Sequence, residues 1–277
     1  TITSKQSAYQ GKLSAYGTIK SGLSTFQTTL QKLTDAAKLQ PRSATAGDTS
    51  LLDVTAGTSA VAGDYSIAVS KLAQAQKLVA AGQSDTTTAI GTGTLTFDFG
   101  TIAGGTLSNG QYSGASFTGN GQASKTVTID GAHATLAGIR DAINAAGIGV
   151  KATIVNDGSG TPYRLTLSST QTGAASSMKI SVNGDIALAN LLDHDPSAAA
   201  GQALSQTQSA QNAEFTVDGL SISKASNSIG DVIPGLTLAL KKTGSTSLSV
   251  AMDAATVKSN IQAFVDGYNK LAGSLKN

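Results

Sequence analysis

The sequence predicts a multi-domain α+β protein, with a helical coiled-coil stem formed by both chain ends and two mainly β head domains, the distal one inserted into the proximal one. Three observations support this prediction. Both ends carry apolar residues at heptad spacing, which is typical of paired helices. Between the ends, Val, Ile and Leu alternate with Thr and Ser, which is typical of strands. The chain of 277 residues is long enough for two or three domains.

The composition indicates cores built from aliphatic side chains. Hydrophobic residues make up 40% of the chain, aromatic residues only 4%, and there is no Trp. There is also no Cys, which excludes disulfides, thiol catalysis and zinc–thiolate sites, and which fits an exported protein that travels unfolded. No run of apolar residues is long enough to span a bilayer, so we expect no membrane insertion.

The first helix of the stem is predicted from Ser4 to Lys38. It should end before Pro41, because the residue preceding a proline avoids the α conformation. The second helix should follow Asp253 as its N-cap. The residues predicted to form the seam between the helices are Tyr9, Tyr16, Ile19, Leu23, Phe26, Leu30, Leu33, Val257, Ile261, Phe264, Tyr268, Leu271 and Leu275.

The two apolar patterns run to the ends of the chain, since one starts at Ile2 and the other includes Leu275. We therefore expect a fragment of a longer protein whose helices continue in both directions. Lys5 and Lys12 replace apolar residues in the second row of the first helix. Fraying of residues 1–15 is the consequence that we predict.

The segments that follow the first helix predict the proximal head domain. A polar linker is expected at 42–50, and residues 72–80 should either extend a strand or form a helical turn. One further helical turn is expected at 229–233. The strands predicted for this domain are 52–56, 65–69, 216–217, 236–240 and 248–250.

The central third of the chain predicts the distal head domain. Residues 104–121 are rich in glycine and should form a long exposed loop or a loosely ordered hairpin. A helix is expected between Thr135 as N-cap and Gly147 as C-terminal stop. Residues 196–213 should form a linker. The predicted strands are 95–99, 126–129, 150–154, 164–168 and 178–182.

The order of these elements predicts three nested domains. The stem consists of residues 1–44 and 253–277, and the proximal domain of residues 45–82 and 207–252. The distal domain, residues 83–206, is inserted into the proximal one. Such insertions are tolerated where the ends of the inserted segment lie close together at a surface.

Little in the sequence indicates chemistry. His194 lies in an Asp-His-Asp-Pro turn whose residue types can bind metals, but adjacent residues do not converge on one ion without a supporting fold. We therefore interpret this segment as a solvated turn. The sequence lacks a phosphate-binding loop and a nucleophile elbow, so we expect no enzyme, with no catalytic, cofactor-binding or metal-binding residues and no cofactor.

The first helix is basic, but its lysines are spread along its length rather than clustered. A nucleic-acid surface normally needs clustered Lys and Arg with stacking aromatic residues. We therefore interpret these lysines as a solvated helix face and expect no nucleic-acid partner.

Four stretches resemble flagellar proteins. The segments 9–23 (YQGKLSAYGTIKSGL) and 62–76 (AGDYSIAVSKLAQAQ), together with 215–220 (FTVDGL) and 229–238 (IGDVIPGLTL), are similar to the bacterial flagellar filament cap family, the hook-associated proteins of type two. Residues 136–168 resemble the "IN" motif that flagellins and hook-associated proteins share, with Ile143-Asn144 and Arg164–Ser168 as its landmarks.

The resemblance implies a structural protein that is exported by the flagellar type III system and lies outside the cell at the tip of the flagellum. It implies a homo-oligomeric ring that retains exported flagellin and promotes its folding and polymerisation. The implied partners are further copies of the chain, flagellin, an export chaperone, and host mucin or glycans. We expect the segments that reach the filament in this family to lie outside this chain, so no residues for polymerisation are assigned.

Two further hypotheses compete with the cap function, and the sequence argues against the second. A surface adhesin could bind host glycans or mucin through the distal domain, with the uncharged segment 104–124 as the binding loop. An exported hydrolase would require convergent carboxylates, and most of the Asp residues instead lie in turns or at helix starts. The cap function is therefore the leading hypothesis and the adhesin is its alternative.

Overall fold

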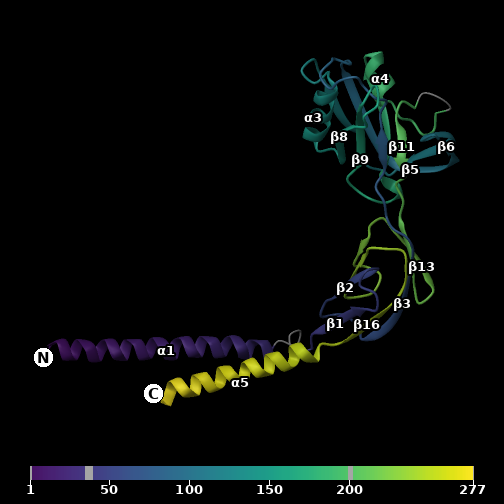
Figure 1. Ribbon diagram of the computed structural model, residues 1–277. Helices are drawn as coiled ribbons and strands as arrows, with labels where there is room; N and C mark the ends of the chain where they lie inside the picture. Colours follow the sequence, from purple (N-terminus) through teal and green to yellow (C-terminus); the bar gives the residue numbers. More distant parts are fainter. Residues whose placement is uncertain (1, 35–39, 199–201, 277) are drawn as a thin grey trace. The chain divides into compact units, whose positions relative to one another are not determined.

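The structure is a computed structural model that describes residues 2–34, 40–198 and 202–276. It confirms a mixed α and β fold (Figure 1). The chain divides into two compact units. The first comprises Thr1–Tyr65, Gly230–Ala239 and Thr246–Asn277, and the second comprises Ser66–Ile229 and Leu240–Ser245. The division into three domains remains a prediction.

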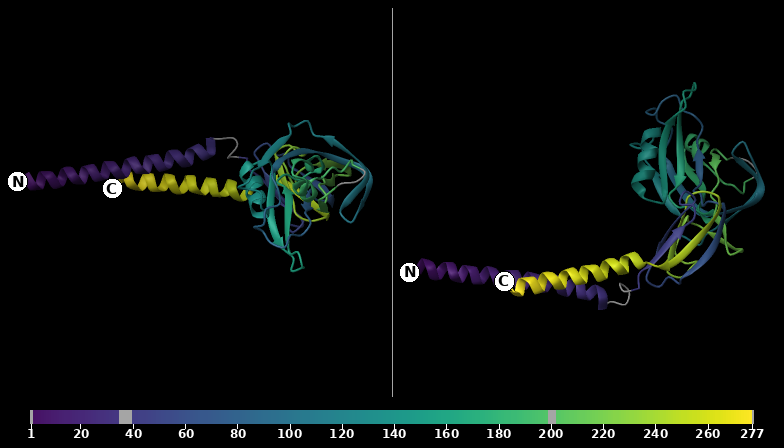
Figure 2. Two further views of the ribbon diagram at one scale, coloured as in Figure 1. Left: turned by 90° about the horizontal axis from the view of Figure 1, so that it is seen from above. Right: turned by 60° about the horizontal axis from the view of Figure 1, so that its bottom comes forward.

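Two long helices dominate the first unit, α1 (Ile2–Thr34) and α5 (Ala254–Lys276), and they lie side by side (Figures 1 and 2). The predicted end of the first helix at Lys38 lies outside the described residues. The predicted cap of the second helix is confirmed. The Asp253 carboxylate accepts hydrogen bonds from the Thr256 backbone N–H at 2.9 Å and from its hydroxyl at 2.6 Å.

Strands complete the first unit. The strand β1 (Arg42–Ala46) pairs antiparallel with β16 (Gly244–Met252), from Arg42 opposite Met252 to Ala46 opposite Leu248. The prediction of a linker at 42–50 is therefore wrong for residues 42–46. This segment lacks large apolar side chains, but a strand can form through backbone pairing without them. The strand β2 (Leu52–Ala56) pairs with β15 (Leu236–Leu240).

The predicted helical turn at 229–233 is also wrong. Residues 228–229 form the strand β14 (Ser228–Ile229), and bends and a turn follow to Gly235. Ile233 precedes Pro234, and the proline ring disfavours the α conformation at the residue before it. Apolar spacing over five residues could not distinguish a helical turn from a tight loop that buries Ile229 and Ile233.

Most of β3 (Gly63–Lys71) lies in the second unit, where it pairs antiparallel with β12 (Ala213–Val217). On its other side β12 pairs with β13 (Leu220–Lys224). The turn between β12 and β13 places Asp218 and Gly219 at φ of 50° and 83°, the left-handed values of a two-residue hairpin turn. The Asp-Gly pair in the sequence was the signal for this hairpin.

The remainder of the second unit contains two four-stranded sheets. One has the order β10-β5-β6, with β7 also paired to β5, and the other has the order β11-β4-β9-β8. The strands are β4 (Lys77–Val79), β5 (Gly93–Ser108), β6 (Gln111–Gly119), β7 (Lys125–Ile129), β8 (Val150–Asn156), β9 (Tyr163–Ser169), β10 (Ser177–Gly184) and β11 (Ser205–Gln208).

The helices α3 (Leu136–Ala146) and α4 (Ile186–Leu192) pack against these sheets, and η1 (Ala174–Ser176) is a short 3-10 turn (Figure 1). The core between them is mainly aliphatic, as the composition predicted. Its fully buried members include Leu78, Phe97 and Ile139. The sequence did not predict α4, because seven residues hold too few helical repeats to show a period.

Three segments of this unit differ from the sequence-based description. Of the two alternatives predicted for residues 104–121, the hairpin is confirmed and the exposed loop is wrong: β5 and β6 pair in an ordered hairpin as far as Gly119, and its turn holds Asn109 and Gly110 at positive φ. Residues 72–80 contain β4, which pairs with β9 and β11 rather than extending β3. The linker predicted at 196–213 contains β11 and buries Gln202, Leu204 and Gln206, so that prediction is wrong for the described residues.

Candidate assembly surfaces

The helices α1 and α5 form an antiparallel pair. The ring of Phe26 lies 5.4 Å from that of Phe264 and 6.2 Å from that of Tyr268, measured between centroids. A Cβ atom added to Gly22 would lie 3.4 Å from Leu271 Cδ1. Gly22 precedes Phe26 in α1, whereas Leu271 follows Phe264 in α5, so the two helices run in opposite directions. The two helix dipoles therefore oppose each other.

The structure divides the predicted seam residues into two sets. One row on each helix is half-buried, and the contact between Phe26 and Phe264 places it between the helices; its members are Ile19, Phe26, Leu33, Val257, Phe264 and Leu271. The other row on each helix is exposed and comprises Tyr9, Tyr16, Leu23, Leu30, Ile261, Tyr268 and Leu275. Only the first set lies in the seam, although Tyr268 still reaches the ring of Phe26 from the edge.

Small and polar residues complete the seam. Gly22 and Thr29 alternate with the apolar row of α1, and Asn260, Gly267 and Ser274 alternate with that of α5. A Cβ on Gly267 would lie 3.1 Å from Thr29 Oγ1, so the backbones approach closely there. Sequence reasoning missed this row because it searched for large apolar side chains. Heptad spacing of small residues was the available signal.

The first half of α1 extends beyond α5 (Figures 1 and 2). Gly22 lies next to Leu271 and Ser274, close to the end of α5, so most of the residues before Ile19 extend past the last described residues of α5. Every side chain from Ile2 to Thr18 is exposed. The large apolar ones among them are Ile2, Tyr9, Leu13 and Tyr16.

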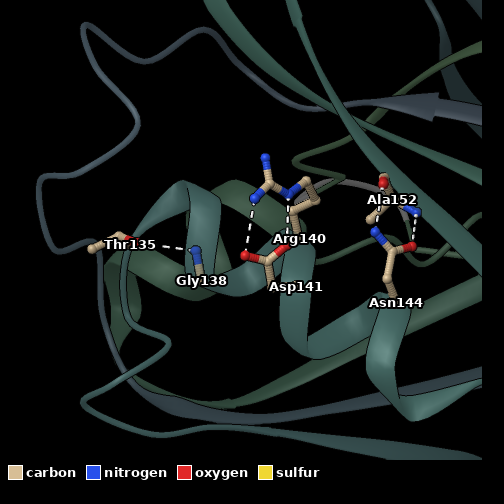
Figure 3. Close-up of polar contacts among 6 residues, drawn as sticks. All are labelled: Thr135, Gly138, Arg140, Asp141, Asn144 and Ala152. Atoms are coloured by element: carbon tan, nitrogen blue, oxygen red, sulfur yellow. Dashed lines mark hydrogen bonds and ion pairs between the residues drawn. The ribbon is translucent and has the colours of Figure 1, made fainter.

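The "IN" stretch in the second unit holds α3 against β8. Thr135 Oγ1 accepts a hydrogen bond from the Gly138 N–H at 3.0 Å, and Gly147 ends the helix at φ 57°, as predicted. The Asn144 amide donates to the Ala152 carbonyl at 2.8 Å and accepts from the Ala152 N–H at 2.9 Å (Figure 3).

Asn144 thus binds β8 as a neighbouring strand would. The strand β8 is at the edge of its sheet, and its other side pairs with β9. Unpaired strand edges invite association with other chains, and a side chain that occupies their backbone groups reduces this risk. The Asn of the motif therefore has a physical role that the sequence alone did not reveal.

Amide side chains also fix the segment that precedes β4. The Gln76 side chain is fully buried, donates to Gln206 Oε1 at 2.6 Å and accepts from the Met178 N–H at 2.6 Å. Gln74 and Gln211 exchange backbone hydrogen bonds of 2.9 and 3.1 Å. These contacts connect segments more than 100 residues apart, and they satisfy polar groups that would otherwise be costly to bury.

His194 is fully buried, so the prediction of a solvated turn is wrong at this residue. Its backbone exchanges two hydrogen bonds of 2.8 Å with Ile180, which draws the segment onto β10. Neither ring nitrogen has a hydrogen-bond partner of good geometry among the described residues, although the backbone of Leu204 approaches the ring. Burial lowers the pKa of His194 to about 4.

Carboxylates lie on both sides of His194 in the sequence. Burial raises the pKa of Asp193, which accepts from the Val182 N–H. Burial acts in the same direction on Asp195, but hydrogen bonds from Lys179 and Ser197 outweigh it and lower the pKa of that carboxyl. The Lys179 Nζ lies 2.7 Å from Asp195 Oδ2. This is a structural ion pair rather than a catalytic arrangement.

The other histidine, His133, is partly exposed, and its Nδ1 lies 2.7 Å from Asp130 Oδ1. The described ranges contain no group of three or more His, Asp or Glu side chains placed to hold a metal ion. None of the helices in the described part of the chain is both long enough and apolar enough to cross a membrane.

Three family models match the chain. They are the flagellar hook-associated protein 2 N-terminus at residues 1–76, its C-terminus at residues 210–277, and the flagellin hook IN motif at residues 116–171. The crystal structure of the flagellar cap protein FliD D1-D2-D3 domains from Escherichia coli is similar with a TM-score of 0.79 at 36% identity, over 95% of this chain and 69% of that one.

Curated relatives agree with these matches. Flagellar hook-associated protein 2 of Escherichia coli strain K12 is 40% identical over 83% of this chain and 45% of its own length. The B-type flagellar hook-associated protein 2 of Pseudomonas aeruginosa is 37% identical over 94% of this chain and 53% of its own length. The chain thus spans about half the length of these relatives. It belongs to the flagellar hook-associated protein 2 family of flagellar cap proteins.

Proposed function

We propose that the protein caps the distal end of the bacterial flagellar filament and there retains exported flagellin and promotes its folding and polymerisation. The similarity to the flagellar cap protein structure, which extends over 95% of the chain, carries this proposal. The match of residues 116–171 to a flagellin hook motif supports flagellin as a partner. The corresponding location is extracellular, at the flagellar tip, after export by the flagellar type III system.

Deletion of the full-length gene in the source bacterium tests this function. A strain without a cap should secrete unpolymerised flagellin and lack normal filaments, and the intact gene should restore them. Immunoblotting of the medium together with electron microscopy of the cells measures both results. Normal filaments in the deletion strain would show that the protein is not the cap.

A homo-oligomeric ring is the assembly that we propose, with the strand-rich domains as its contacts and the α1–α5 pair as part of a stem. The chain of 277 residues should self-associate weakly on its own, because relatives about twice as long have further segments to contribute. Light scattering of this chain beside a protein of the relatives' full length measures the difference. Strictly monomeric behaviour of both would contradict the ring.

An export chaperone and host mucin or glycans complete the partners that we propose. The adhesin alternative depended on residues 104–124 as an uncharged binding loop. Most of that segment is an ordered hairpin whose tip is fixed, since the Gly110 carbonyl accepts a hydrogen bond from the Gln206 N–H at 2.6 Å. We therefore keep the cap as the function and treat adhesion as a secondary property, testable by mucin binding of the whole chain.

A further inference from the structure

The chain contains the dipeptide Asn-Gly at three places, Asn109-Gly110, Asn120-Gly121 and Asn183-Gly184. Asparagine is one of the thermally labile residues of proteins. The backbone nitrogen of the next residue can attack its side-chain amide carbon, and a glycine favours this attack because it has no Cβ to restrict the backbone. All three Asn side chains are exposed, so exposure alone does not show which of them reacts.

Asn109 lies in the two-residue turn of the β5–β6 hairpin. Asn109 and Gly110 have φ of 51° and 78°, the left-handed values of such a turn. Ring closure would have to rotate the backbone of Asn109 out of this conformation. The pairing of Ser108 with Gln111 opposes that rotation. So does the hydrogen bond of 2.6 Å from the Gln206 N–H to the Gly110 carbonyl, and the hairpin should therefore protect Asn109.

Asn183 lies within β10. Its backbone is opposite Thr94 of β5, and Gly184 is opposite Gly93. A Cβ atom added to Gly184 would lie 2.4 Å from the Thr92 carbonyl oxygen, so the backbone has no room to rotate there. The strand should therefore protect Asn183 from the same reaction.

Asn120 lies in the connection between β6 and β7, and residues 120–124 are all exposed. A Cβ atom added to Gly121 would have nothing within 4 Å, so backbone rotation meets no obstacle. The Asn120 N–H donates to the Phe99 carbonyl at 2.9 Å, which restrains φ of Asn120 but not ψ, the angle that ring closure changes. Within the described ranges no acceptor binds the Gly121 N–H. The attacking nitrogen is therefore accessible.

The side chain of Asn120 folds back along the chain toward this nitrogen. Its Oδ1 accepts a hydrogen bond from the Gln122 N–H at 3.0 Å, the contact of an Asx turn. This bond polarises the amide carbonyl and holds its carbon close to the intervening backbone nitrogen, which favours an intramolecular attack. Its Nδ2 donates to the Ala175 carbonyl at 3.1 Å, an exposed contact that is lost when the amide nitrogen leaves.

We propose that Asn120 is a site of spontaneous deamidation through a succinimide formed with Gly121. A base in the solvent removes the proton of the Gly121 N–H, this nitrogen forms a bond to Asn120 Cγ, and the Cγ–Nδ2 bond breaks. The amide nitrogen takes up a proton from the solvent and leaves as ammonia. Water then opens the succinimide ring at either carbonyl and gives aspartate or isoaspartate, with no oxidation or reduction.

Either product carries a carboxylate where Asn120 has an amide. A carboxylate cannot donate to the Ala175 carbonyl, so the contact of this connection with η1 is lost. Isoaspartate also inserts a methylene group into the main chain between β6 and β7. The fraction of modified chains therefore rises with the age of the protein. The proposal rests on this geometry and does not depend on the cap function.

Incubation of the intact chain in neutral buffer, followed by mass spectrometry of its peptides, tests the proposal. Chymotrypsin cuts after aromatic residues, and Phe117 lies between Asn109 and Asn120. In the folded protein, the mass increase of deamidation should appear at Asn120 at least about 10-fold faster than at Asn109 or Asn183. In denaturant the three rates should become similar, because the fold is what distinguishes the three Asn-Gly pairs.

Changes of pH and sequence complete the test. The reaction of Asn120 should accelerate in proportion to hydroxide concentration, since it starts from the deprotonated nitrogen. Asn120→Gln should remove the rapid site, because glutamine must close a larger ring, and the matched control Asn109→Gln should leave the rate at Asn120 unchanged. Equal rates at the three sites of the folded protein would overturn the proposal. So would an Asn120 that stays intact in the folded protein, or a faster reaction at Asn109 or Asn183.

Discussion

Asn144 shows how one side chain can connect a helix to a strand edge. Its amide satisfies both backbone groups of Ala152, one as donor and one as acceptor. In Asn144→Ala both groups lose their partner, and we expect a loss of about 1–3 kcal/mol in unfolding free energy. Denaturant unfolding measures this loss, and hydrogen exchange of the Ala152 amide should accelerate.

The control for this variant is Asn120→Ala. Asn120 also bonds backbone groups, those of Ala175 and Gln122, but it is exposed and lies outside the α3–β8 contact. Its removal should cost less stability and leave exchange at Ala152 unchanged. Equal losses in both variants would mean that Asn144 has no special role at the strand edge.

His194 makes the stability of the second unit depend on pH. Its pKa is about 4 in the folded protein against an ordinary value of 6.5, because burial disfavours the charged imidazole. Between these values the unfolded chain binds more protons, so stability is complete above about pH 6.5 and is lost as the pH falls toward 4. The full effect is about 3 kcal/mol. Asp193, whose pKa is raised by burial, acts in the opposite direction.

Thermal unfolding of the intact chain between pH 7 and 4 measures this dependence. His194→Leu removes the titrating group and should reduce the loss of stability over this range. His133→Gln, which removes the partly exposed histidine, is the control and should keep the loss. An unchanged pH dependence in His194→Leu would exclude the buried imidazole as its cause.

The role of a single residue could be predicted from the sequence where it depends only on neighbouring residues in the chain. Thr135 and Gly147 were predicted as the limits of α3, since caps depend only on the adjacent turn of helix. The burial of His194 was not predictable, because it depends on Ile180 and the segment near Leu204, which the fold brings there. The same applies to Gln76, whose partners are more than 100 residues away.

Among the elements, the helix pair was predicted correctly in kind but not in detail. Heptad spacing established two helices with apolar rows, yet each helix has two such rows and the spacing does not show which one faces the partner. The structure selects the rows of Phe26 and Phe264, where the small residues Gly22 and Gly267 permit close approach. The close approach of the two backbones, and not the apolar spacing alone, therefore determines which row faces the partner helix.

Residues 2–16 of α1 should exchange their amide hydrogens faster than residues 19–33. The first segment lies beyond α5 and carries Lys5 and Lys12 in the row that faces the partner later in the helix. Isolated helices of this length are marginal in water, and packing supplies most of their stability. Hydrogen–deuterium exchange read by mass spectrometry compares the two segments within one molecule. Equal protection would show that α1 is stable without a partner.

For the whole molecule, the sequence and the structure both pair segments from distant parts of the chain, and the strand β4 bears on where the predicted distal domain begins. The sequence-based domain of residues 83–206 excludes β4, because Leu72–Ala80 shows no clear alternation. In the structure β4 lies between β11 and β9, and Leu78 is fully buried in the core of that unit. Non-local pairing of a three-residue strand leaves almost no trace in a sequence.

The fragment 73–212 should therefore fold on its own, whereas the fragment 83–206 should not. The longer fragment keeps β4, the buried Gln76 and the hydrogen bonds between Gln74 and Gln211. The shorter one loses the strand between β9 and β11, and removing a buried leucine alone costs about 2–5 kcal/mol, a large share of the 5–15 kcal/mol that stabilises a typical domain.

Thermal unfolding followed by circular dichroism distinguishes the two fragments. We expect a cooperative transition for 73–212 and none for 83–206, and Leu78→Ala in the longer fragment should lower its midpoint. If 83–206 unfolds cooperatively at the same temperature as 73–212, β4 is dispensable and the boundary lies at residue 83. A cooperative transition of the fragment 73–212 alone would instead place the domain boundary before β4. The backbone hydrogen bonds between Gln74 and Gln211 would then lie at this boundary and connect the distal domain to β3 and β12.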